Sequence, residues 1–463
     1  VGPSTIGSEL ELALVDNDTL LPSMTNTDLC YQNALKAKPN NIQPEISRFC
    51  LEYNGSVIWT NKQPLNTLAN EMELILADLR ETALKKYNTK IIPIGIIPTL
   101  TTGDLKNNVL TPYWRYHAID KIMRLMRNNE KFLLNIKGED HLQLKWPDTA
   151  LEGVNFSYQV HLRVNPTEYN DLFNSAQAAA AFVLAVSGNS PMLLGHKLWE
   201  ESRIAVFEQI VNNVGTHPGF LQEQQRVAFG RGWINSGAIG LLKETCELFY
   251  PILPQSCRNF PSKDNQTKDR GPELNAIMQH NSSVWPWNRA IYDPAYGGHF
   301  RIEMRYLPAG PTVYDMIMNA GFMIGLTKAL SNEINTIIPN LPFKYAQYNF
   351  YQAAQHGLKA TCIWPEKNRL VEQPIIKLLD QMLDWSAFGL QQLGASDLEI
   401  RNMQTCIRDR YTKNQTGSIW QRKIYNKLIA KKLNTADALY EMFNLYIKYQ
   451  QTNLPVSQWS LEI

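Results

Sequence analysis

Three stretches of this 463-residue chain alternate strictly between hydrophobic and polar positions. They cover residues 4–16, 156–164 and 299–305. Because successive side chains of a strand point to opposite faces, each stretch predicts a β-strand with one apolar and one polar face. The polar faces carry Glu9 and Glu11 in the first strand, Gln159, His161 and Arg163 in the second, and Arg301, Glu303 and Arg305 in the third.

Each polar face also fits a purely structural interpretation. Glu-x-Glu is typical of an exposed edge strand, a lone strand histidine of a hydrogen-bonded structural residue, and Arg-x-Glu-x-Arg of an ion-paired outer face. The same kind of face nevertheless recurs in three strands. In addition, Glu52 lies in a fourth, otherwise apolar segment, where an unpaired carboxylate is costly. The recurrence favours one shared site over independent surface charges.

The rest of the chain predicts mostly helices. Residues 64–87, 111–134, 176–186 and 313–332 are predicted helices, and residues 90–98 a Pro-bounded, Ile-rich strand. Residues 43–54 lead from a Pro-marked loop into the strand that holds Glu52. Residues 257–273 predict a long polar loop, which would serve as a lid if it lies near an active site. After Pro342 the chain is helical and polar, with no site pattern.

Composition narrows the class of protein. Apolar residues make up 44% of the chain and charged residues 19%, and the net charge of +2 gives no reason to expect nucleic acid as a partner. The longest apolar run, residues 178–186, is far shorter than the ~20 residues of a membrane span. Six cysteines without a Cys-x-x-Cys pair indicate a reducing compartment, so we expect a cytoplasmic protein. The chain starts at Val1, which leaves a removed leader open.

The combined polar faces indicate metal and phosphate chemistry. Carboxylates in excess with one histidine suit Mg²⁺ or Mn²⁺ better than a structural zinc ion. Arginines beside such a site suit a phosphate that is being transferred. The chain contains neither a Walker loop nor a Gly-x-Gly-x-x-Gly fingerprint, so the sequence predicts a nucleotide-dependent enzyme without a P-loop.

Segments 6–12, 160–164, 285–289 and 301–315 resemble the type 2 glutamate-cysteine ligase family, carboxylate-amine ligases of the glutamine synthetase superfamily. The order Glu-x-Glu, Glu, His, Arg-x-Glu-x-Arg is also similar to that of glutamine synthetase itself. The resemblance is good over residues 5–60, 155–210 and 280–330, and faint over the C-terminal third. It implies an α+β fold in which a curved, largely antiparallel sheet forms a funnel with helices outside. We therefore expect a catalytic region at 1–335 and a helical region at 336–463 packed on it, or one continuous domain.

The resemblance also implies roles for individual residues. The metal ligands would be Glu9, Glu11, Glu45, Glu52, His161 and Glu303, with Glu9 and Glu11 on different magnesium ions. Arg301, Arg305 and Glu303 would be catalytic, and Arg289, Arg301, Arg305, Gln159 and Arg163 would bind ATP and its phosphates. Arg203 would hold the carboxylate of the acid substrate.

The implied reaction is ATP-dependent ligation of a small-molecule acid, glutamate being the expected one, to an amine such as cysteine, through an acyl phosphate. An ammonia-using ligase similar to glutamine synthetase and a degenerate member that only binds nucleotide or regulates are the alternatives. No motif selects cysteine as the amine, and the 257–273 loop has no family counterpart. The sequence leaves open whether the protein forms a homo-oligomer.

Overall fold

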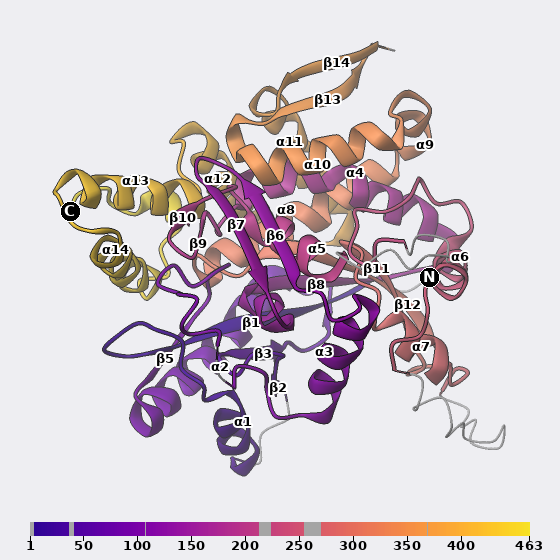
Figure 1. Ribbon diagram of the computed structural model, residues 1–463. Helices are drawn as coiled ribbons and strands as arrows, with labels where there is room; N and C mark the ends of the chain where they lie inside the picture. Colours follow the sequence, from indigo (N-terminus) through magenta and orange to yellow (C-terminus); the bar gives the residue numbers. More distant parts are fainter. Residues whose placement is uncertain (1–3, 37–40, 107, 213–223, 254–269, 368) are drawn as a thin grey trace.

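The computed structural model describes residues 4–36, 41–106, 108–212, 224–253, 270–367 and 369–463 (Figure 1). Its centre is an eight-stranded, curved antiparallel sheet with the strand order β11-β12-β8-β1-β3-β2, and with β4 and β5 also paired to β1. This architecture confirms the α+β expectation. The strands are β1 (Thr5–Asp16), β2 (Ile42–Pro44), β3 (Cys50–Asn54), β4 (Ile58–Trp59), β5 (Thr89–Ile92), β8 (Ser157–Val164), β11 (Asn288–Asp293) and β12 (His299–Pro308).

The register of the sheet sets polar residues of neighbouring strands opposite one another. Glu303 of β12 pairs with His161 of β8 on one side and with Arg289 of β11 on the other. Glu11 of β1 is opposite Glu52 of β3. Side chains directly opposite in a pair share a face and lie close together, so these strands form one continuous polar face.

One irregularity interrupts the pairing of β12 with β8. Met304 pairs with Val160 and Leu307 pairs with Tyr158, so β12 holds one residue more than β8 between these two pairs. This β-bulge lies directly after Glu303 and contains Arg305. A bulge redirects side chains locally, and it often occurs next to active sites.

Helices cover the opposite, apolar face of the sheet. The nearly fully buried α4 (Tyr169–Ser187) and α8 (Val313–Ser331) pack on each other and against the strands. Helix α11 (Ile376–Leu393) approaches α8 so closely that a Cβ on Gly389 would meet the carbonyl oxygen of Gly325 at 1.9 Å. The C-terminal region therefore packs tightly on the helical layer behind the sheet.

The other helices surround this core (Figure 1). They are α1 (Asn26–Leu35), α2 (Pro64–Tyr87), α3 (Trp114–Met126), α5 (Ser202–Asn212), α6 (Gly237–Leu248), α7 (Asn275–Asn281), α9 (Ile334–Ile337), α10 (Phe343–His356), α12 (Asp397–Thr412), α13 (Gly417–Ala430) and α14 (Thr435–Gln450). The 3₁₀ helices are η1 (Thr149–Val154), η2 (Pro166–Glu168), η5 (Ile338–Asn340), η6 (Gly357–Lys359) and η7 (Val456–Gln458). Three small two-stranded sheets are β6 (Phe132–Lys137) with β7 (His141–Trp146), β9 (Met192–Leu193) with β10 (His196–Lys197), and β13 (Thr361–Glu366) with β14 (Arg369–Pro374).

The structure corrects two predicted elements. The helix expected over 111–134 ends at Met126, because Asn128 and Asn129 adopt left-handed backbone conformations, with φ of 55° and 61°. The chain then enters β6, which alternates buried and exposed residues. The strand expected over 90–98 ends at Ile92, before Pro93, which has no N–H to donate to the sheet.

The structure bears on the predicted polar loop and on membrane-spanning segments. The predicted 257–273 loop lies outside the described residues except for 270–273. Within the described residues, every helix is too short or too polar to cross a membrane.

Candidate active site

A possible metal-binding cluster lies at the centre of the polar face. Nε2 of His161 is 3.0 Å from Oε1 of Glu9 and 3.6 Å from Oε1 of Glu303. One donor atom from each of the three residues lies within 4.8 Å of the others. Three neighbouring strands contribute one ligand each, because the register brings β1, β8 and β12 side by side. This spacing allows the three residues to hold a single ion.

The histidine ring lies between the two acids. Among the described residues, Nδ1 of buried His161 has no hydrogen-bond partner, and Nε2 faces the carboxylates of Glu9 and Glu303 at 3.0 and 3.6 Å. Buried polar nitrogens are almost always satisfied. A neutral imidazole would direct its lone pair between the carboxylates, where it can bind a cation. Two carboxylates and one imidazole fit the expected Mg²⁺ or Mn²⁺.

Glu303 is held between two guanidiniums. Arg289 donates to it from Nε at 2.6 Å and from Nη2 at 3.0 Å, and Nη1 of Arg305 donates at 3.0 Å. Burial alone would raise the pKa of Glu303, but attraction to Arg289, Arg305 and His161 outweighs it and lowers the pKa. The carboxylate is therefore charged throughout the physiological range.

One partner of Glu303 differs from the prediction. The Arg-x-Glu-x-Arg pattern predicted Arg301 and Arg305 on either side of Glu303, but Arg289 takes the place of Arg301. A residue directly opposite on the next strand is nearer than a residue two positions along the same strand. Arg301 instead pairs loosely with Asp293 at 3.7 Å.

Besides Glu9 of the cluster, four carboxylates line an acidic cavity of about 290 Å³. Glu11 accepts a hydrogen bond from the Ser157 backbone at 2.5 Å, and Glu52 accepts from Gln43 and, at 2.8 Å, from Asn54. The other two are Glu45 and Glu152.

Burial and mutual repulsion raise the pKa values of these four acids. Burial, then repulsion from Glu9, raises the pKa of Glu52 to about 7, and burial, then repulsion from Glu11, raises that of Glu152 to about 8. Burial and neighbouring carboxylates also raise the pKa of Glu45, and burial raises that of Glu11. Such a site favours a second cation, or a positively charged ligand.

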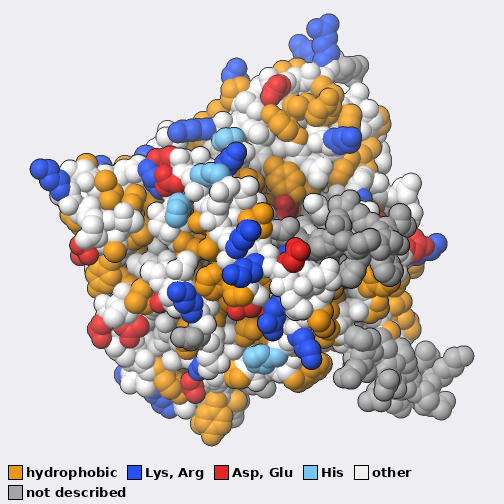
Figure 2. Space-filling view, viewed as in Figure 1, with side chains coloured by type: hydrophobic (Ala, Val, Ile, Leu, Met, Phe, Trp, Pro, Cys, Tyr) orange, Lys and Arg blue, Asp and Glu red, His pale blue; other side chains and the backbone are white. Residues whose placement is uncertain are grey.

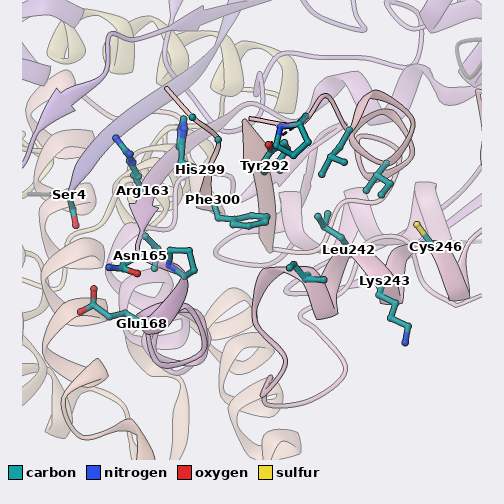
Figure 3. A pocket seen from close by; sticks show the side chains of 18 of the residues that line it. Ser4, Arg163, Asn165, Glu168, Leu242, Lys243, Cys246, Tyr292, His299 and Phe300 are labelled. Atoms are coloured by element: carbon teal, nitrogen blue, oxygen red, sulfur yellow. Dashed lines mark hydrogen bonds between the residues drawn. The ribbon is translucent and has the colours of Figure 1, made fainter. Parts of the chain in front are cut away.

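The cationic end of the polar face leads to a larger cavity. Arg163 and Arg301 are directly opposite in the register, two pairs beyond His161 and Glu303 and therefore on the same face. Arg163 also lines a cavity of about 950 Å³, where it and His299 lie at one end and Leu242 and Cys246 at the other (Figure 3). The aromatic side chains of Tyr292 and Phe300 line the same cavity. Its mixture of cationic and aromatic groups suits a ligand with a charged end and a flat apolar end.

The structure gives Arg203 a different setting from the one expected. This arginine is 2% exposed, donates from Nε to Glu201 at 2.7 Å and from Nη2 to the Tyr306 carbonyl at 2.9 Å. Glu201 in turn accepts from the Asn189 backbone and from Ser190. Arg203 is absent from the described lining of the acidic cavity. Arg203 therefore already has two protein partners, and its role in holding the carboxylate of the acid stays a prediction.

Two charged residues of the acidic cavity were not identified from the sequence. Glu152 lies in the short η1 and Arg115 on α3, both outside the strands whose alternation marked the site. Only their proximity in the fold reveals them. For Arg115, the single signal in the sequence is a cation at helical spacing from Ile119 and Met123.

Comparisons with known proteins identify the family of the chain and relatives of its fold. The sequence model of glutamate-cysteine ligase family 2 matches residues 5–427. The fold resembles that of a glutamate–cysteine ligase from Francisella tularensis solved in complex with AMP, with 12% identity, a TM-score of 0.58, and coverage of 99% of this chain and 90% of that one. It also resembles a bifunctional glutathione synthetase from Pasteurella multocida, with 10% identity, a TM-score of 0.50, and coverage of 97% and 53%. Among curated proteins, none matches significantly.

Proposed function

Because the chain belongs to glutamate-cysteine ligase family 2, we propose that it is an ATP-dependent ligase that joins the side-chain carboxyl of glutamate to an amine, cysteine or another amino compound, through an acyl phosphate. The observation that carries the proposal is the cluster of Glu9, His161 and Glu303 beside two arginines on one sheet face.

The carboxylates and the histidine would hold divalent cations. Glu9, His161 and Glu303 would bind one Mg²⁺ or Mn²⁺ ion, and Glu11, Glu45 and Glu52 would bind another. When bound, these ions supply positive charge that offsets the charge of the ATP phosphates. The raised pKa values of Glu45 and Glu52 support this assignment, because a cation relieves the repulsion that raises them.

The arginines would act on the phosphoryl group that moves. Arg289 and Arg305 are already oriented by Glu303, so they need little reorganisation to stabilise charge on the transferring phosphoryl group. Gln159 positions Arg305 by accepting from Nη1 at 2.7 Å. Arg163 and Arg301 lie farther along the face, and we assign them to the remaining phosphates. The cavity of about 950 Å³ next to Arg163 would take the nucleoside.

The two substrates would meet at the acidic cavity. A glutamate side-chain carboxylate attacks the γ-phosphorus of ATP, which gives an acyl phosphate and ADP. The amine then attacks the acyl carbon, and phosphate leaves. Walls formed by Phe207, Ile210 and Trp285 would exclude water from the acyl phosphate.

The free thiols support a proposal for the compartment. The described cysteines are all free, three of them buried, which suits a reducing compartment, and we place the enzyme in the cytoplasm.

Product analysis tests the proposal. With Mg-ATP, glutamate and a panel of amines including cysteine and ammonia, we expect ADP and phosphate, and ¹⁸O from the glutamate carboxylate in the released phosphate. Formation of AMP and pyrophosphate, or ¹⁸O-free phosphate during productive ligation, contradicts the acyl-phosphate route. Ligation to ammonia alone favours the glutamine synthetase-like alternative. Binding of Mg-ATP without any turnover favours a degenerate, nucleotide-binding member.

A further inference from the structure

Glu208 of α5 differs from other interior acids in having no cationic partner. On the molecular surface, charges of both signs are interspersed, as the face in Figure 2 shows. In the interior, Glu201 and Glu303 are each paired with arginine. Glu208 is partly buried, and in the described ranges of the chain no arginine or lysine forms an ion pair with it. A buried acid without a cation is costly, so its presence beside the candidate site needs a reason.

Two neutral donors bind Glu208 instead. Its Oε1 accepts a hydrogen bond from Nε1 of Trp287 at 2.8 Å and another from the hydroxyl of Tyr351 at 2.7 Å. Burial raises the pKa of Glu208 to about 7, although these two hydrogen bonds lower it. A carboxylate and a carboxylic acid both offer an oxygen that accepts such bonds. Glu208 therefore joins α5 to the residue before β11 and to α10 in either protonation state.

Trp287 connects this acid to the bulge of β12. The backbone carbonyl of Trp287 accepts from the N–H of Arg305 at 2.9 Å. The tryptophan is 2% exposed, and its ring packs edge-to-face against Phe207, with 5.8 Å between the ring centroids. Few side-chain torsions separate the indole from its own backbone, so an indole that is fixed at both its edge and its N–H also fixes the carbonyl.

Arg305 depends on this carbonyl because of the bulge. On the β8 side, the register shifts between Met304 and Leu307, so Arg305 lies where the ladder with β8 is interrupted. Its guanidinium nevertheless donates to Glu303 at 3.0 Å. A preorganised cation stabilises a transition state only while it keeps its position, and a shift of about 1 Å costs up to ~100-fold in rate. The bond to Trp287 thus fixes the backbone of Arg305 from the β11 side.

On the basis of the proposed function, in which Arg305 stabilises the transferring phosphoryl group, we propose that Glu208 is a positioning residue that acts on Arg305 through Trp287. When the acceptor at Glu208 is lost, the indole is released, the carbonyl of Trp287 shifts, and the guanidinium of Arg305 loses its alignment. The main effect falls on kcat, because the interaction that weakens is one made with charge that develops during phosphoryl transfer.

Two variants that each remove one donor separate positioning from stability. Trp287→Phe and Tyr351→Phe both delete a hydrogen bond to the same oxygen of Glu208 and keep an aromatic ring, but of these two residues Trp287 is the one bonded to Arg305. We expect Trp287→Phe to lower kcat ~10-fold with a KM for the acid within about twofold of wild type. Tyr351→Phe should keep kcat within about twofold, and melting curves of both variants record the loss of stability.

A second pair of variants tests the acceptor itself. Glu208→Leu removes the acceptor, whereas Glu208→Gln keeps a carbonyl oxygen that accepts from both donors. Glu208→Leu should lower kcat ~10-fold or more, and Glu208→Gln should restore most of this loss. Should Glu208→Leu fail to fold, the comparison of Trp287→Phe with Tyr351→Phe decides. Equal losses of kcat in those two variants would overturn the positioning role.

Hydrogen exchange measured by mass spectrometry separates this inference from the proposed function. Because the Arg305 amide donates to Trp287, the fragment 303–307 should exchange faster in Trp287→Phe and Glu208→Leu than in wild type. It should exchange at the wild-type rate in Tyr351→Phe and Glu208→Gln. Wild-type exchange of this fragment in Trp287→Phe overturns the inference. Exchange as expected in an enzyme that shows no turnover with any acid and amine supports the link from Glu208 to Arg305 and defeats only the proposed function.

Discussion

Replacement of Glu303 by glutamine tests the centre of the site. The side chain is 2% exposed, and glutamine keeps its size but removes the charge that two guanidiniums share. Removal of one partner from a buried ion pair typically costs ~3–5 kcal/mol, because the remaining charge is left uncompensated. We therefore expect Glu303→Gln to fold with a lower free energy of unfolding by about this amount, and to lose turnover.

Magnesium distinguishes a metal ligand from a structural acid. A ligand that binds only the folded state stabilises it by ~2.7 kcal/mol at 100 times its Kd. Wild type should therefore melt at a higher temperature with Mg²⁺ than without it, and Glu303→Gln should lose most of this increase. The assay is thermal denaturation over a Mg²⁺ titration, accompanied by circular dichroism to verify the fold.

The matched control is Glu201→Gln, which removes the charge of another buried acid that is paired with an arginine, outside the acidic cavity. This variant should lose a similar free energy of unfolding but keep the full response to Mg²⁺. Glu81→Gln, on the exposed side of α2, should change neither quantity. If Glu303→Gln retains both turnover and the Mg²⁺ response, Glu303 is purely structural and the metal assignment is wrong.

Three further predictions follow from burial and charge. In folded protein without divalent ions, the pKa of Glu52 is about 7 and that of Glu152 about 8, so the folded state keeps protons that an unfolded chain releases near pH ~4.3. Stability should therefore fall as the pH rises from about 4.5 to 8, and Mg²⁺ should reduce this decline; a flat pH profile in calorimetry would contradict the raised pKa values. Arg203→Gln should lower the melting temperature and leave the KM for the acid unchanged, whereas a raised KM at an unchanged melting temperature would assign Arg203 to substrate binding after all. Arg163→Gln should raise the KM for ATP ~10-fold with little effect on the KM for the acid, and equal effects on both would remove Arg163 from the nucleotide site.

The period-two pattern predicted the part of the site that lies on strands. It placed Glu9, His161 and Glu303 on polar faces, because the alternation of side chains depends only on local geometry. Hydrophobic periodicity likewise predicted α2 to the residue. The antiparallel sheet itself was predicted from the family resemblance, since periodicity within one strand does not say which strand lies next to it.

Features that depend on neighbours could not be predicted. One of the two arginine partners of Glu303 is Arg289, because the register of β11 with β12 brings them together, and no single strand contains that information. The sequence does not show that Arg203 forms an ion pair with Glu201, two positions earlier, because the local fold decides that contact. The β6–β7 hairpin was missed because a helical interpretation was extended past two asparagines that end the helix by their backbone conformation. Arg115 reaches the cavity from a helix with no polar alternation at all.

The bulge in β12 limits how this protein can be altered. Between Met304 and Leu307 the strand contains one residue that its partner β8 does not match. Because the pairs on both sides of the extra residue are already in register, deleting one residue here would remove the bulge and leave Met304 and Leu307 on the faces they occupy now. What would be lost is the local redirection of Arg305, which donates to Gln159 and Glu303. Directed evolution of this segment should therefore vary the identity of its residues and keep its length, and libraries that contain single-codon deletions between 304 and 307 should yield no active clones.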